Sequence, residues 1–241
     1  MKNSKHIFLF FLLGVLMSLN VNAQFFKGFV SGGFSASQID GDEVYGFKKV
    51  GFTGGIGAMM PFNADRPNEG LQFSLEINYS NRGAKENHWG DPFKYEASLD
   101  YIDIPVMVHW IDKRGGVTLG IGAQYGRLVH SYEAWGLTDT LIHGMERPLT
   151  TNARFDKNDW SFVGDLRFTM WQKFKIDVRY QYSLVPIRKD FEFFNSYNLN
   201  DNVNFRKWTR DFKSSWVTVK LIYMINEEQE VKSTPKRKTA F

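Results

Sequence analysis

The stretch that decides the fold is FKIDVRYQYSL, residues 174–184. Apolar or aromatic side chains occupy every second position, and polar or charged side chains occupy the positions between. This period of two residues is that of a β-strand, whose successive side chains point to opposite faces. A soluble sandwich would bury the apolar face and expose Lys175, Asp177 and Arg179 to water. A membrane barrel would turn the same pattern inside out, so the rest of the chain has to decide.

Segments with the same alternation recur along the whole chain, and no helical period of comparable length lies between them. There are about eight of them, at residues 25–37, 47–60, 71–83, 95–111, 117–132, 159–171, 174–187 and 214–225. The connections after the second, fourth and sixth segments are short or turn-like, and the others are longer. An even number of strands with short turns at one end and long loops at the other is typical of outer-membrane barrels. We therefore predict an all-β fold, an eight-stranded antiparallel transmembrane barrel of outer-membrane type, with a soluble β-sandwich as the alternative.

The first residues have the features of a secretory signal peptide. Lys2 and Lys5 precede an apolar run of about 13 residues, too short for the roughly 20 that a spanning helix needs. Small side chains before Gln24 suit a signal peptidase. We predict a signal peptide at 1–23, the barrel at 24–225 and a charged periplasmic tail at 226–241.

Composition excludes several classes of protein. The 241 residues contain no cysteine, which excludes a lipid-anchored product and a disulfide-stapled domain. Because residues 1–23 hold two lysines and no acid, the rest of the chain keeps 28 basic and 26 acidic side chains. That balance gives no reason to expect a nucleic-acid partner.

In a barrel, the polar face of each strand would line the lumen. By parity, the inward charged residues are Glu76, Arg82, Asp103, His109, Asp165, Arg167, Asp177, Arg179 and Lys220. A barrel of eight strands is just wide enough for side chains to fill, so such charges must pair or be hydrated. A lumen plugged by salt bridges is one interpretation, and a narrow selective conduit is the other. Several glycines point inward by the same parity and leave room either for long arginine side chains or for water: Gly55, Gly57, Gly120, Gly122 and Gly126.

The apolar faces would meet lipid, which makes outer-membrane lipid an expected partner. Aromatic residues near the strand ends are the expected interfacial girdles. They are Tyr79, Trp110, Tyr125, Trp160, Tyr180, Tyr182 and Trp216.

Several blocks of the sequence carry a family resemblance. They include LQFSLEINYSNRGAKE, YIDIPVMVHW, LGIGAQYGRLV, FDKNDWSFVGDLRF and VRYQYSLVPIR. In order and spacing the chain resembles the small outer-membrane β-barrels of Bacteroidota, often called PorT-like. The resemblance implies an eight-stranded barrel in the outer membrane of a Gram-negative bacterium of that phylum. Some relatives serve type IX secretion and most have no assigned activity, so the resemblance implies a fold and a location.

Patterns that would indicate catalysis or metal binding are weak. The glycine-rich stretches GFTGGIGA and GIGAQYG lack the Lys-Ser/Thr pair that grips a phosphate. His88, His143 and Ser131 have no spacing that defines a hydrolase. The acidic run at 40–43 is too short for a known calcium loop. We expect no catalytic site, metal site or cofactor.

The predicted loops are rich in aromatic residues among Asn and Arg, a composition that protein interfaces favour. The candidate partner contacts are Trp89, Trp135, Phe191, Phe193, Phe194 and Trp208. One alternative is that the strands continue past the membrane and these rings pack against one another, and another is that the rings capture a glycan or other ligand. We predict a non-enzymatic accessory or scaffold subunit of a larger envelope complex for type IX secretion, outer-membrane protein assembly or nutrient uptake. A stand-alone narrow pore or ligand-binding barrel is the alternative, and a hydrolase or acyltransferase at the rim is a weaker one. With an even number of strands, both termini would be periplasmic.

Overall fold

The computed structural model describes residues 26–42, 46–63, 68–85, 93–112, 116–137, 154–171, 173–196 and 205–226. These residues form nine strands. Their bounds are β1 Lys27–Asp40, β2 Lys49–Pro61, β3 Gly70–Lys85, β4 Phe93–Ile111, β5 Val117–Leu137, β6 Asn158–Trp171, β7 Phe174–Ser183, β8 Arg188–Ser196 and β9 Phe205–Met224. No helix in the described part of the chain is long and apolar enough to cross a membrane.

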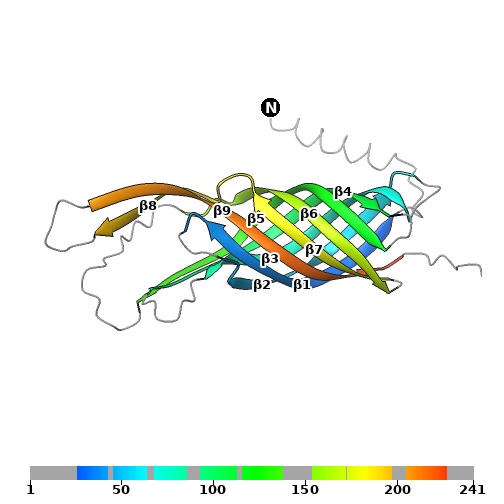
Figure 1. The fold of residues 1–241 in the computed structure, drawn as a ribbon, viewed down its shortest axis with the longest axis horizontal. Helices are drawn as coiled ribbons and strands as arrows, with labels where there is room; N and C mark the ends of the chain where they lie inside the picture. The colour runs from blue at the N-terminus through cyan, green and yellow to red at the C-terminus, as the bar shows by residue number, and fades with distance from the viewer. Residues whose placement is uncertain are drawn as a thin grey trace, which may run out of the picture.

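Eight of the strands close into an antiparallel barrel (Figure 1). Strands β1 to β7 pair in chain order, β7 pairs with β9, and β9 pairs with β1. The closing ladder runs from Phe29 opposite Met224 to Asp40 opposite Lys213. Closure removes the free edges of the sheet, since every barrel strand then has two neighbours. The prediction of an eight-stranded antiparallel barrel is confirmed.

The ninth strand, β8, lies outside the barrel. It pairs with the first half of β9, and the two strands protrude beyond one end of the barrel (Figure 1). The prediction that the seventh strand runs to residue 187 and is followed by a loop up to 213 is wrong. The strand stops at Ser183, because Pro186 has no N–H to donate to a ladder. Pairing resumes at Arg188, and β9 begins at Phe205.

The protruding end is the one at which the predicted long loops begin, and we call it the loop side. The opposite end, with the short connections 112–116 and 172–173, is the turn side. Strands β4, β5 and β9 have 19, 21 and 20 residues. A tilted strand needs only about 9–11 residues to cross a bilayer. All three therefore continue well past the membrane on the loop side.

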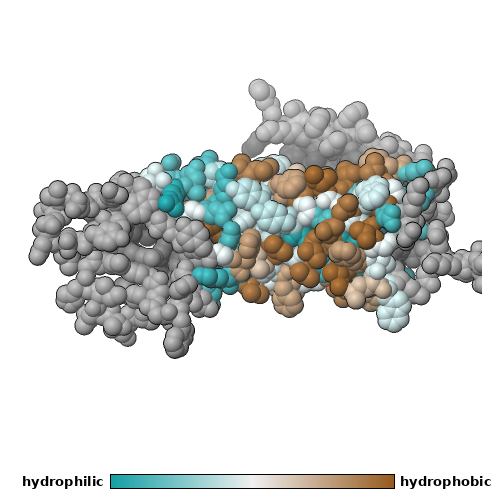
Figure 2. Space-filling view, in the orientation of Figure 1, coloured by the Kyte–Doolittle hydropathy of each residue, from teal (hydrophilic) through white to brown (hydrophobic). Residues whose placement is uncertain are grey.

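The outer face of the barrel is apolar and the inner face is polar. On β3, Leu71, Leu75 and Ile77 are exposed, whereas the alternate side chains of Ser74 and Glu76 are buried. Figure 2 shows hydrophobic side chains gathered over the barrel and hydrophilic ones at its loop-side end. This is the inverse of a soluble protein, so the apolar band is the surface that meets lipid.

One β-bulge changes the parity of β5. Tyr101 faces Leu128 and Asp100 faces His130, so Val129 is an extra residue in the ladder. Beyond a bulge, each later side chain moves to the opposite face of the strand. Glu133, which strict alternation would place outside, therefore turns inward.

Candidate functional site

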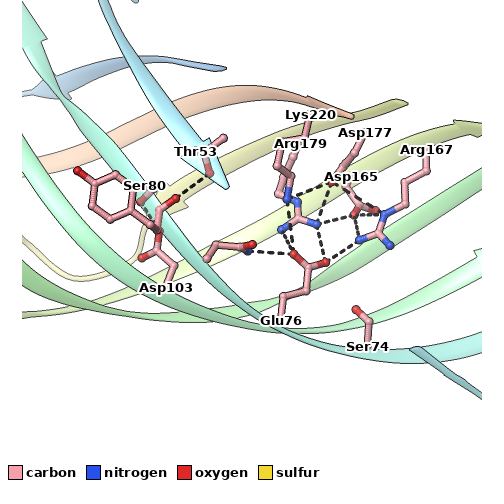
Figure 3. Close-up of polar contacts among 12 residues, drawn as sticks. Thr53, Ser74, Glu76, Ser80, Asp103, Asp165, Arg167, Asp177, Arg179 and Lys220 are labelled. Atoms are coloured by element: carbon pink, nitrogen blue, oxygen red, sulfur yellow. Dashed lines mark hydrogen bonds and ion pairs between the residues drawn. The ribbon is translucent and has the colours of Figure 1, made fainter. Parts of the chain in front are cut away.

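A cluster of six charged side chains fills the middle of the lumen (Figure 3). They come from four strands: Glu76 from β3, Asp165 and Arg167 from β6, Asp177 and Arg179 from β7, and Lys220 from β9. Each is at most 5% exposed. Three carboxylates face three cations, so the cluster is electrically balanced. Such balance is what a buried site requires, since an unpaired buried charge costs several kcal/mol or more.

Glu76 is the centre of this lumen cluster. Its carboxylate accepts two hydrogen bonds of 2.9 Å from Nη1 and Nη2 of Arg179, and one of 2.8 Å from Nη2 of Arg167. Lys220 Nζ lies 3.5 Å away from the same carboxylate. Paired guanidinium nitrogens match the two oxygens of a carboxylate, so this contact is specific in geometry as well as charge.

Strand register brings the remaining charges together. Asp165 faces Arg179, and Arg167 faces Asp177, in the β6–β7 ladder. Asp177 also faces Lys220 in the β7–β9 ladder, with Lys220 Nζ 3.3 Å from Asp177 Oδ2. Opposite charges at directly opposed positions stabilise a sheet. The alternation seen in FKIDVRYQYSL therefore supplies one face of the cluster.

Arg82 occupies a second buried position nearer the loop side. Its guanidinium lies between the rings of Tyr101 and Trp216, 3.7 and 3.8 Å from their centroids. Its Nη2 donates a hydrogen bond of 2.8 Å to Asp159 and lies 3.7 Å from Asp103. Cation–π contacts of this kind strengthen when they are desolvated. Trp216 was predicted in a lipid-facing girdle, and that prediction is wrong because its side chain is fully buried in the lumen.

His109 lies nearer the turn side, between Ser74 and Asp165. Its Nε2 is 2.7 Å from Ser74 Oγ, and its Nδ1 is 3.4 Å from Asp165 Oδ1. The order resembles a hydrolytic triad, but Ser74 and His109 are fully buried and the Asp165 carboxylate is bonded to Arg167. A catalytic nucleophile must be reachable by its substrate, and the buried Ser74 hydroxyl is not. The contact instead connects side chains of different strands inside the lumen. His88 and His143 lie outside the described residues.

Apolar layers bound the charged interior at both ends. On the turn side, Phe29, Met59, Ile222 and Met224 form one buried cluster. On the loop side, a larger cluster consists of Ile39, Ala84, Ala97, Leu99, Tyr101, Ile187 and Phe212. Water and ions would have to pass two apolar clusters and a balanced charge cluster to cross the lumen.

Two lumen glycines make room for the charged side chains. A Cβ at Gly120 would lie 2.0 Å from Asp165 Oδ1 and 2.4 Å from His109 Nδ1. A Cβ at Gly126 would lie 2.7 Å from Asp103 Oδ1 and 3.1 Å from Arg82 Nη2. Of the two sequence-based interpretations of these glycines, the structure supports the one in which they accommodate side chains.

A contact that the sequence did not reveal ties the protruding strands to the barrel. Arg188, at the start of β8, donates two hydrogen bonds of 2.9 and 2.8 Å to the Glu133 carboxylate on β5. Its guanidinium also stacks on Phe155 at 4.1 Å and Phe191 at 4.8 Å. Parity places Glu133 on the outer face, and only the bulge at Val129 turns it toward Arg188. The sequence contains no signal for that bulge.

Five of the six predicted partner contacts fall on the protruding strands. Phe191 packs against Phe212 with ring centroids 5.0 Å apart. Phe193 faces Trp208 in the β8–β9 ladder, and Phe194 is the next residue of β8. Trp135 lies in β5, and Trp89 lies outside the described residues. The alternative that these strands continue past the membrane therefore holds for β8 and β9, and the Phe191–Phe212 contact shows one pair of rings packed together.

A comparison with protein families gives a single description, outer membrane protein beta-barrel domain, matched over residues 8–209. The chain belongs to this outer-membrane barrel family. It is accordingly a protein of the Gram-negative outer membrane, and the apolar band is its lipid-facing surface. The interior described above is the lumen of this outer-membrane barrel.

Solved structures show the same type of fold at low sequence identity. The barrel is similar to Ail, the attachment invasion locus protein of Yersinia pestis, in complex with the heparin analogue sucrose octasulfate, with 14% identity and a TM-score of 0.43 over 83% of this chain and 99% of that one. It is also similar to Neisserial surface protein A, with 10% identity and a TM-score of 0.40 over 83% and 97% of the two chains. No curated protein matches the sequence. Similarity this low carries no inference about function.

Proposed function

We propose that this outer-membrane barrel is a non-conducting, non-enzymatic scaffold that presents a protein-binding platform on its loop side. The platform consists of the two protruding strand pairs, β4–β5 beyond Asp100 and His130, and β8–β9. In this role the chain is an accessory subunit of a larger envelope complex.

The observation that carries the proposal is the occupied lumen. The six-residue lumen cluster balances its own charges, and apolar layers lie on both sides of it. A transport pathway needs a hydrated route with sites that an ion can enter and leave. The interior has the features of a structural core, which leaves the outside of the barrel to carry the function.

The protruding strands offer free sheet edges. Among the described residues, β8 pairs with β9 alone, and β5 beyond His130 pairs with β4 alone. Two-stranded ribbons are marginally stable in water, and an unpaired edge is a template for a further strand. An extended segment of a partner protein can pair with such an edge through main-chain hydrogen bonds. We infer that the partner binds in this way.

The proposal includes an orientation and a setting. In this orientation both termini face the periplasm. Outer-membrane barrels have short turns on the periplasmic side and long loops outside, so the loop side faces the cell exterior. The candidate host complexes are those for type IX secretion, outer-membrane protein assembly and nutrient uptake, and the sequence does not choose among them.

Purification of the tagged chain from its native outer membrane in mild detergent tests the proposal. We expect a large barrel or a periplasmic or secreted protein to co-elute stoichiometrically through size exclusion. The pure chain should give no conductance steps in a planar bilayer. If the chain elutes alone and conducts, the scaffold proposal is wrong and the narrow-pore alternative replaces it.

A further inference from the structure

A polar and aromatic cluster lies on the outer wall of the barrel at the loop-side edge of the apolar band. Its members are Tyr125 and Arg127 on β5, and Asn158 and Trp160 on β6. Tyr125 faces Trp160, and Arg127 faces Asn158, in the β5–β6 ladder. We call these four residues the Arg127 cluster.

Side-chain contacts hold the Arg127 cluster in a fixed arrangement. Asn158 Oδ1 accepts a hydrogen bond of 2.8 Å from the Tyr125 hydroxyl and one of 2.6 Å from Arg127 Nη1. The Tyr125 and Trp160 rings are tilted against each other with centroids 5.2 Å apart. The guanidinium is therefore positioned directly beyond an aromatic pair, and Arg127 itself is exposed.

The level of the cluster along the barrel axis identifies its surroundings. Toward the turn side on the same strands come exposed apolar residues, with Phe162 at 40% one step from Trp160 and Ile121 at 59% two steps from Tyr125. Tyr and Trp concentrate where the hydrocarbon core meets the head groups. Arg127 lies one step further out, at the level of the head groups themselves.

Among the described residues, the Arg127 guanidinium bonds to the neutral amide oxygen of Asn158 and pairs with no carboxylate, so its charge is open to an anionic ligand. Lys157 is exposed beside Asn158, and the Leu128 N–H donates to its carbonyl, so the chain is held close to β5 at this point. His130 is exposed further along β5 and lies 3.4 Å from Asp100, whose carboxylate also accepts a hydrogen bond from Asn81. Asp156 is the exposed acid next to Lys157.

We propose that the Arg127 cluster binds the phosphorylated head group of lipid A, the glycolipid of the outer leaflet. A guanidinium recognises phosphate through two parallel N–H donors, and basic side chains next to a lipid-facing surface bind anionic head groups. The assignment to lipid A rests on the orientation in the proposed function, which places the loop side in the outer leaflet. Inner-leaflet phospholipid shares the phosphate chemistry, and the experiment separates the two sources.

Native mass spectrometry of the refolded barrel in detergent, with added lipid A, measures this binding. We expect Arg127→Ala to weaken lipid A binding about tenfold, as loss of a charge-assisted hydrogen bond does. Lys189→Ala, an exposed loop-side lysine on β8, is the matched control and should bind like the wild type. Dephosphorylated lipid A should bind to the wild-type barrel as weakly as lipid A binds to Arg127→Ala.

A second variant guards against a folding defect. Asn158→Ala keeps the charge and releases the guanidinium, so it should weaken binding by a smaller factor. Equal binding of lipid A to Arg127→Ala, Asn158→Ala and wild type overturns the site. Arg127-dependent binding of phosphatidylglycerol as tight as that of lipid A overturns the assignment to lipid A. No protein partner takes part in this assay, so its outcome is independent of whether the chain purifies alone.

Discussion

Glu76 on β3 and Arg179 on β7 form a two-hydrogen-bond pair across the lumen, although their strands are not neighbours in the sheet. Ladder hydrogen bonds connect each strand only to the next one. A pair that spans the lumen instead braces opposite walls of the barrel. Because Arg167 and Lys220 reach the same carboxylate, Glu76 is the point at which three strands are tied to β3.

Substitution of Glu76 tests this brace. Glu76→Ala leaves three cations facing two carboxylates in a buried interior, so we expect the free energy of unfolding to fall by about 3–5 kcal/mol. Urea unfolding of the refolded barrel in lipid vesicles measures the change. The double variant Glu76→Ala, Arg179→Ala should cost less than the sum of the two single variants, because the two residues share one network. Additive losses would show that the pair is not coupled.

The lumen glycines give a prediction with an internal control. Gly120→Ala puts a Cβ against the Asp165 carboxylate and the His109 ring, and overpacking of this kind costs roughly 1–3 kcal/mol. Gly32→Ala is the control, because it lies on a barrel strand and a Cβ there meets no described heavy atom within 4 Å. We expect the control to be neutral or slightly stabilising. Urea midpoints that shift equally in both variants would contradict the packing argument.

The position of Trp216 can be checked by quenching with brominated lipids. Single-tryptophan variants that retain Trp110 or Trp160, which are 48% and 52% exposed on the outer wall, should be quenched strongly. A variant that retains Trp216 should be quenched weakly, because its ring is enclosed by the lumen wall and Arg82. Strong quenching of Trp216 would return it to the lipid-facing girdle.

Much of this architecture follows from the period of two residues in each strand. Parity alone places Glu76, Asp165, Arg179 and Lys220 on the polar face, because one residue out of step would reverse the whole strand. Applied to β9, the same parity puts Trp216 inside, opposite in direction to Val217. The position of Trp216 in the strand therefore decides its face, and its residue type does not.

Other features depend on backbone irregularities that the pattern of side chains does not encode. The bulge at Val129 turns Glu133 inward, and Pro186 lies in the break between β7 and β8, which both pair with β9. The 188–213 stretch has no clean alternation, since Phe193 and Phe194 are adjacent, so the sequence pattern predicts a loop there. These are the places where tertiary pairing overrides local pattern.

The bulge at Val129 allows Glu133 to pair with Arg188, and the strength of this ion pair can be tested. It joins β8 to β5 over the loop-side end of β6, and it is backed by the rings of Phe155 and Phe191. Loss of a charge-assisted contact costs about 1.5–3 kcal/mol. Arg188→Ala should therefore raise the equilibrium constant for opening of the 184–191 segment by about tenfold or more. Hydrogen exchange of the Ile187 amide, which donates to the Phe212 carbonyl, reports this opening. Amides of β1 to β3 should exchange as in the wild type, and Lys189→Ala should leave Ile187 protected. If Ile187 stays equally protected in Arg188→Ala, the apolar packing of Ile187 holds the segment and the ion pair does not.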